Sequence, residues 1–136
     1  MKTLVIYYSY SGKTRKIANE IAMKEDADVV EIKDVKRIGK FRAYTSGCLA
    51  AMTSKAWPIQ PIETDYAKYE RLVLLAPVWA GNPPPAFHSF MEQLPADKII
   101  SVKMISASGK ISCRAKLEKV IKAKNGSLTN FEDIKV

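Results

Sequence analysis

The strongest constraint on the fold of this chain is an apolar run followed at once by a polar turn and a helical pattern. The run is Leu4–Tyr8 and the turn is Ser9–Thr14. Apolar residues then recur at helical spacing, at Ile17, Ala18, Ile21 and Ala22. A nearly continuous apolar run is typical of a strand that is covered on both faces of a sheet. The pattern therefore predicts a strand over Thr3–Tyr8, a tight turn, and a helix from Gly12 to Lys24.

This turn has the composition of a phosphate site. The start of a helix offers unpaired backbone N–H groups and the positive end of the helix dipole. Ser9, Ser11 and Thr14 add hydroxyl donors, and Gly12 lets the backbone approach an anion without an intervening Cβ. An ordinary serine-capped helix is the alternative interpretation of the same residues.

Two larger phosphate motifs are excluded. A nucleotide-triphosphate loop that ends in Gly12-Lys13-Thr14 needs a glycine five positions earlier, where this chain has Tyr7. The dinucleotide fingerprint needs three spaced glycines, which the turn lacks. What remains is a loop sized for one phosphate.

The rest of the chain alternates between strand and helix patterns. Strands are predicted over Asp28–Lys33, Arg71–Ala76, Lys98–Ile105 and Leu128–Val136. One helix follows Pro83–Pro85, with Phe87, Phe90, Met91 and Leu94 on its apolar side, and another is capped by Ser112 and ended by Asn125-Gly126. Such alternation predicts an α/β fold: one domain over 1–136, with a doubly wound parallel sheet of five strands in the order 2-1-3-4-5.

Two regions depart from this rhythm. Residues 35–66 are expected to form a partly helical insertion between strands 2 and 3, because Ile38, Phe41, Thr45, Leu49 and Met52 recur every three or four residues. The helix that would normally follow strand 5 is not apparent in the sequence. We therefore expect apolar surface of the sheet to be left uncovered. Our hypothesis is that a second copy of the chain covers it in a homodimer.

Two further loops are expected at the same sheet edge as the phosphate turn. Pro77-Val78-Trp79-Ala80-Gly81-Asn82 follows strand 3, and a tryptophan among turn-forming residues suits stacking on a planar ring. Ser106-Ala107-Ser108-Gly109 follows strand 4 and is small and polar. Three loops thus offer a phosphate cradle, an aromatic wall and a close-approach backbone.

On these three motifs the chain resembles the flavodoxin-like family, in particular its short FMN-binding members. The resemblance implies non-covalently bound FMN, with the 5′-phosphate held by Ser9, Ser11, Gly12, Lys13 and Thr14 and with Tyr10 lining the turn. It implies that Trp79 stacks on the isoalloxazine. It also implies that backbone groups of Pro77, Val78, Ala80, Gly81 and Asn82 reach the ring edge, and that Ser106, Ala107, Ser108 and Gly109 contact its pyrimidine end.

The third loop lacks the second aromatic residue that long-studied flavodoxins usually carry there. The other flavin face is therefore open to a substrate or is covered by Tyr44 or Trp57. Three functions stay open: an electron-transfer flavoprotein, an NAD(P)H-dependent reductase of FMN, quinones or other small acceptors, and a binding module that has lost its flavin. Direct reduction by NADH or NADPH distinguishes the first two.

The net charge of +8 is concentrated in two stretches. Between Lys98 and Lys124 there are eight Lys or Arg residues and one acidic residue, Glu118. Between Lys33 and Lys55 there are six Lys or Arg residues and one acidic residue, Asp34. A lysine-rich surface without a partner is one interpretation; association with acidic molecules is the other. For a flavodoxin-like protein we predict a redox partner with an acidic surface or a small-molecule acceptor, and neither nucleic acid nor a membrane span.

No residue is predicted to be catalytic and no metal site is predicted. The only histidine, His88, is interpreted as a surface or capping residue. Cys48 is interpreted as a residue that packs among apolar neighbours. Cys113 stands near a helix start, where a thiolate is favoured, although a buried, inert thiol is the preferred interpretation. Two cysteines do not make a disulfide framework, and we predict a cytoplasmic protein.

Overall fold

The computed structural model describes residues 2–35, 57–79, 81–106, 111 and 113–135. The strands are β1 (Thr3–Tyr7), β2 (Asp28–Glu31), β3 (Arg71–Pro77), β4 (Ile99–Ser106) and β5 (Ser127–Lys135). The helices are α1 (Lys13–Glu25), α4 (Pro85–Glu92), α5 (Arg114–Ala123) and the short 3-10 helix η2 (Tyr66–Lys68). None of the helices in these ranges has the length and apolar character needed to cross a membrane.

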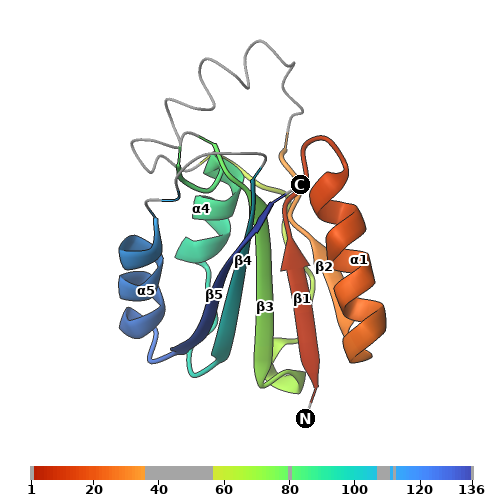
Figure 1. Ribbon diagram of the computed structural model, residues 1–136. Coiled ribbons are helices and arrows are strands. Elements are labelled where there is room, and N and C mark those ends of the chain that lie inside the picture. The colour runs from red at the N-terminus through yellow and green to blue at the C-terminus, as the bar shows by residue number, and fades with distance from the viewer. Residues whose placement is uncertain (1, 36–56, 80, 107–110, 112, 136) are drawn as a thin grey trace.

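The five strands form one parallel sheet in the order β2-β1-β3-β4-β5. Their carboxyl ends share the upper edge of the sheet in Figure 1. The chain moves from β1 outward to β2 and then crosses to β3 on the other side of β1, so the topological switch point lies between β1 and β3. The predicted strand order is confirmed.

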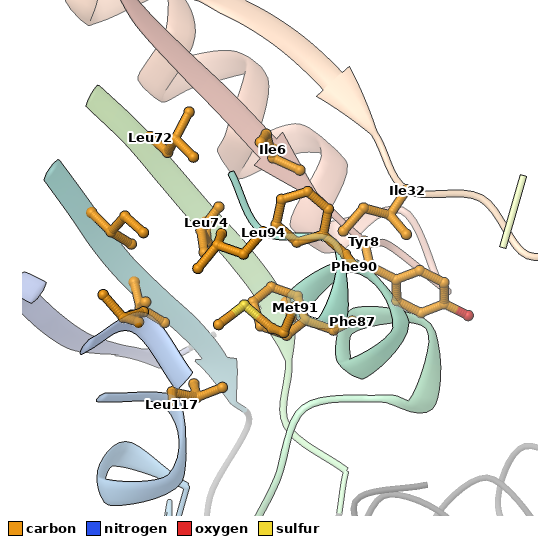
Figure 2. Close-up of a cluster of buried hydrophobic side chains, with 14 of the residues drawn as sticks. Ile6, Tyr8, Ile32, Leu72, Leu74, Phe87, Phe90, Met91, Leu94 and Leu117 are labelled. Carbon is orange, nitrogen blue, oxygen red and sulfur yellow. The ribbon is translucent and has the colours of Figure 1, made fainter. Parts of the chain in front are cut away.

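The apolar run of β1 is explained by helices on both faces of the sheet. Leu4 and Ile6 lie in the larger core with α4 and α5, whereas Val5 and Tyr7 lie in the smaller core with α1. Figure 2 shows part of the larger core, where Phe87 and Phe90 of α4 lie close to Leu74 of β3. Since alternate side chains point to opposite faces, both sets are buried and the run is nearly continuous.

Helix α5 begins one residue later than predicted. Its N-cap is Cys113, whose carbonyl oxygen accepts the N–H of Leu117 at 3.0 Å. The prediction of Ser112 as the cap is therefore wrong, and Ser112 itself lies outside the described residues. The predicted stop is confirmed: Asn125 has a left-handed φ of 55°, and the Gly126 N–H bonds back to Ile121 at 2.9 Å.

Most of the predicted insertion, residues 36–56, lies outside the described residues, and with it Tyr44, Cys48 and the expected helical pattern. Its two flanks are joined to each other by backbone hydrogen bonds. Gln60 N–H donates to the Lys33 carbonyl at 2.8 Å, and Asp34 forms an antiparallel bridge with Ile59. The insertion therefore leaves and returns just beyond β2, at the carboxyl edge of the sheet.

The expectation of an open apolar surface is not met. Helix α1 packs over β1, β2 and β3, and within the described ranges no second helix covers this face beside it. The uncovered part of β4 and β5 is largely polar, with Ser101 beside Asn130 and an ion pair of 2.6 Å between Lys103 and Glu132. Charged cross-strand pairs suit a solvated surface. The homodimer stays a prediction, and this surface gives it no support.

Candidate functional site

The turn between β1 and α1 depends on a glycine with a left-handed backbone. Gly12 is the N-cap of α1 with φ of 99°, a conformation that side chains rarely allow, and a Cβ there would meet nothing within 4 Å. Its N–H donates to Ser9 Oγ at 3.0 Å, while no side chain caps the helix itself. The N–H groups at the start of α1 thus remain available in the way an anion site requires.

A cavity of about 270 Å³ lies beside this turn, at the carboxyl edge of the sheet. It joins three segments that are far apart in the sequence, and its walls are Tyr10, Ser11, Lys13, Thr14, Pro77, Val78, Trp79, Ile105 and Ser106. All but Ile105 were predicted from the sequence. Ile105 resembles any buried strand residue, and only its position next to Ser106 could have indicated it.

The α1 side of this cavity is suited to an anion. Lys13 is exposed, the Thr14 side chain is buried at 2% exposure, and both belong to the first turn of the helix. Their neighbour Ser11 adds a hydroxyl. Hydroxyl donors, a cation and the helix dipole all favour negative charge at this point.

Trp79 is held as an aromatic wall on another part of the cavity. Its backbone N–H and C=O bond to those of Asn82 at 2.7 and 3.0 Å, in a tight turn where Gly81 has φ of 80°. The rings of Tyr8 and Tyr10 meet its indole edge-on, with centroids 6.3 and 5.9 Å away. Backbone bonds and edge contacts therefore fix the indole, and neither tyrosine stacks on it in parallel.

Ser106 ends β4 and lines the cavity at 5% exposure. Its Oγ donates a hydrogen bond of 2.7 Å to Asp133 Oδ1 on β5. Asp133 is not recognisable as a site residue from the sequence, because an exposed carboxylate on a strand carries no local signal of a partner on the neighbouring strand.

Comparison with known proteins identifies the architecture. No family model and no curated protein sequence matches the chain. A crystal structure of a flavoprotein in complex with FMN from Lactobacillus acidophilus NCFM superposes with a TM-score of 0.80 at 22% identity, covering 97% of this chain and 92% of that one. A flavodoxin from the domain Archaea superposes with a TM-score of 0.57 at 18% identity, covering 100% and 84%. The chain has a flavodoxin-like fold.

A third solved structure with this fold is a flavone reductase. It superposes with a TM-score of 0.60 at 12% identity over 99% of this chain, which spans 54% of the reductase chain. The flavodoxin-like fold is thus shared by proteins named as flavodoxins and by a protein named as a reductase, so the fold alone does not distinguish the two functions.

Some predicted site residues lie elsewhere. Ser9 lines a neighbouring cavity of about 280 Å³ that shares Tyr10 with the main cavity, and the ion pair of 2.6 Å between Arg15 and Glu31 lies in its wall. Gly12, Gly81 and Asn82 shape the turns without lining the main cavity. Ala80, Ala107, Ser108 and Gly109 lie outside the described residues.

The resemblance implied that backbone groups of Val78 and Asn82 reach the ring edge, and the N–H of each of these residues is used inside the protein. Val78 N–H donates to the Ile105 carbonyl at 3.0 Å and so continues the ladder between β3 and β4. Asn82 N–H donates to the Trp79 carbonyl. Because each N–H has one proton to give, any contact of these two residues with a ring would use other backbone atoms, and their place at the ring edge stays a prediction.

Three other candidates do not line the main cavity. The Trp57 carbonyl accepts the hydroxyl of Ser89 on α4. His88 borders a separate groove between α4 and α5. Cys113 is buried, and burial raises the pKa of its thiol to about 11. The predicted burial of Cys113 is therefore confirmed, and a buried thiol with a raised pKa is a poor nucleophile near neutral pH.

Proposed function

We propose that this protein binds FMN non-covalently and transfers electrons through it. The observation that carries the proposal is the single cavity that joins the amino end of α1 to the indole of Trp79 at the switch point of the sheet. The donors around α1 suit a phosphate, and the aromatic and aliphatic walls suit a flat ring. The FMN complex of the Lactobacillus flavoprotein supports this assignment.

The chain's own residues bind and orient the cofactor. Bound FMN would supply the redox chemistry, and the protein would supply position and electrostatics. Ser11, Lys13 and Thr14 would hold the phosphate from the α1 side. Trp79 would cover one face of the ring, while Val78 and Ile105 exclude water beside it. The net charge of +8 favours a redox partner with an acidic surface, and a cytoplasmic location stays a prediction.

Titration with FMN and with riboflavin tests the phosphate assignment. We expect FMN to bind at least tenfold more tightly than riboflavin, because riboflavin lacks the phosphate that pairs with charged and N–H donors. Lys13→Gln should weaken FMN binding about threefold and reduce its salt dependence, since an exposed ion pair contributes roughly 0.2–1 kcal/mol. Riboflavin binding should be unchanged by this substitution.

Lys24→Gln is the matched control, because it makes the same charge change in the last turn of α1. It should leave both affinities unchanged. Equal affinities for FMN and riboflavin would contradict the proposal that the α1 side of the cavity binds the phosphate. A chain that takes up neither flavin would instead favour the binding module without a cofactor.

A reductase is the second candidate, because a flavone reductase shares the fold over 99% of this chain. The two functions differ in the source of electrons. For the carrier we expect NADH or NADPH alone to leave the visible absorbance of the FMN-loaded protein unchanged, and a partner reductase to bleach it. Rapid bleaching by NADH or NADPH alone, at a rate that saturates with the nucleotide, would establish the reductase.

A further inference from the structure

The cavity wall contains a hydroxyl whose proton is already used. Ser106 is 5% exposed, and its Oγ lies 2.7 Å from Asp133 Oδ1. An ionised carboxylate can only accept hydrogen bonds, so the proton between these atoms comes from the serine. Bonds to a charged acceptor are also among the stronger hydrogen bonds in proteins, which keeps this orientation fixed.

The hydroxyl of Ser106 can therefore accept a hydrogen bond from a group in the cavity but cannot donate one to it. Its oxygen keeps lone-pair capacity while its single proton points at β5. This contrasts with the α1 part of the wall, where Lys13 is a cation that only donates. A ligand that satisfies both parts carries an anionic group near α1 and a hydrogen-bond donor near the end of β4.

We propose that Asp133 is a positioning residue that makes Ser106 a hydrogen-bond acceptor for the bound ligand. Asp133 does not line the cavity and acts only through the serine. The inference rests on the proposed FMN function. Oxidised FMN offers two kinds of donor that this acceptor could take, the ring N3–H and the ribityl hydroxyls. Asp133 thus favours a ligand with a hydrogen-bond donor at this wall, although Asp133 itself does not touch the ligand.

A double-mutant cycle tests the proposal. The FMN dissociation constants of wild type, Ser106→Ala, Asp133→Ala and the double variant are measured by flavin fluorescence. We expect each single substitution to weaken binding about tenfold, the usual effect of a lost or reversed hydrogen bond. The double variant should bind no more weakly than Ser106→Ala, because Asp133 has nothing to act on once the hydroxyl is gone.

Glu132→Ala is the matched control. It removes the neighbouring carboxylate of β5, which pairs with Lys103 rather than with a cavity residue, and should change FMN affinity less than twofold. Thermal unfolding of each variant without flavin checks the fold. Asp133→Val, a better strand former, repeats the test if Asp133→Ala is poorly folded.

Lumiflavin, which keeps the ring and lacks the ribityl phosphate, identifies the donor. A loss that persists with lumiflavin assigns the ring N3–H, and a loss confined to FMN assigns a ribityl hydroxyl. Additive losses, or an Asp133→Ala variant with wild-type affinity, would overturn the inference and leave FMN binding intact. A wild-type chain that binds no FMN would overturn the proposed function and this inference together.

Discussion

Trp79→Ala is expected to weaken FMN binding about thirtyfold. The indole lines the cavity and is fixed there by the Trp79–Asn82 turn and by the edges of Tyr8 and Tyr10. Stacking of a planar base on an aromatic side chain contributes about 1–3 kcal/mol on alanine substitution, and about 2 kcal/mol corresponds to thirtyfold. Quenching of flavin fluorescence on titration into the flavin-free protein measures the change.

Two variants separate stacking from a general loss of structure. Trp79→Phe keeps an aromatic face and should lose less than tenfold. Trp57→Ala removes the chain's other tryptophan, which does not line the cavity and whose bond to Ser89 runs through the backbone carbonyl. It should leave FMN affinity unchanged. If Trp79→Ala binds like wild type while Trp57→Ala does not, the ring stacks on Trp57 instead.

The strands and helices were predictable because the burial of an element determines the spacing of its apolar residues in the sequence. A strand covered on both faces must be apolar at consecutive positions, as in Leu4–Tyr7, and a helix over a sheet repeats apolar residues every three or four positions, as in α4. The strand order then followed from the alternation of strands and helices and from the position of the polar turn after the first strand. The same patterns do not fix the helix boundaries, and the cap of α5 is Cys113 rather than the predicted Ser112.

Most residues that line the cavity were predictable from the sequence, whereas their hydrogen bonds were not. Parallel strands bring their carboxyl ends to one edge, so Ser11, Trp79 and Ser106 had to meet there. Which backbone donors remain for a ligand depends on the ladder register, and the use of Val78 N–H by Ile105 leaves no mark in the sequence. The bond from Ser106 to Asp133 joins residues 27 positions apart and depends on the register between β4 and β5.

Phe87→Ala is expected to destabilise the fold by about 3–5 kcal/mol, since a deleted buried ring loses its transfer free energy and leaves a cavity. Phe87 is fully buried, its ring centroid lies 6.4 Å from that of Phe90, and Figure 2 shows both rings in the core under α4.

Urea unfolding followed by circular dichroism measures the loss of stability in Phe87→Ala against the wild type. Met23→Ala is the control, because Met23 of α1 is 86% exposed and its truncation should cost less than about 0.5 kcal/mol. A Phe87→Ala variant as stable as Met23→Ala would mean that α4 does not pack against the sheet as described. Because α4 follows the Trp79–Asn82 turn directly, that result would also withdraw the support for the aromatic wall of the cavity.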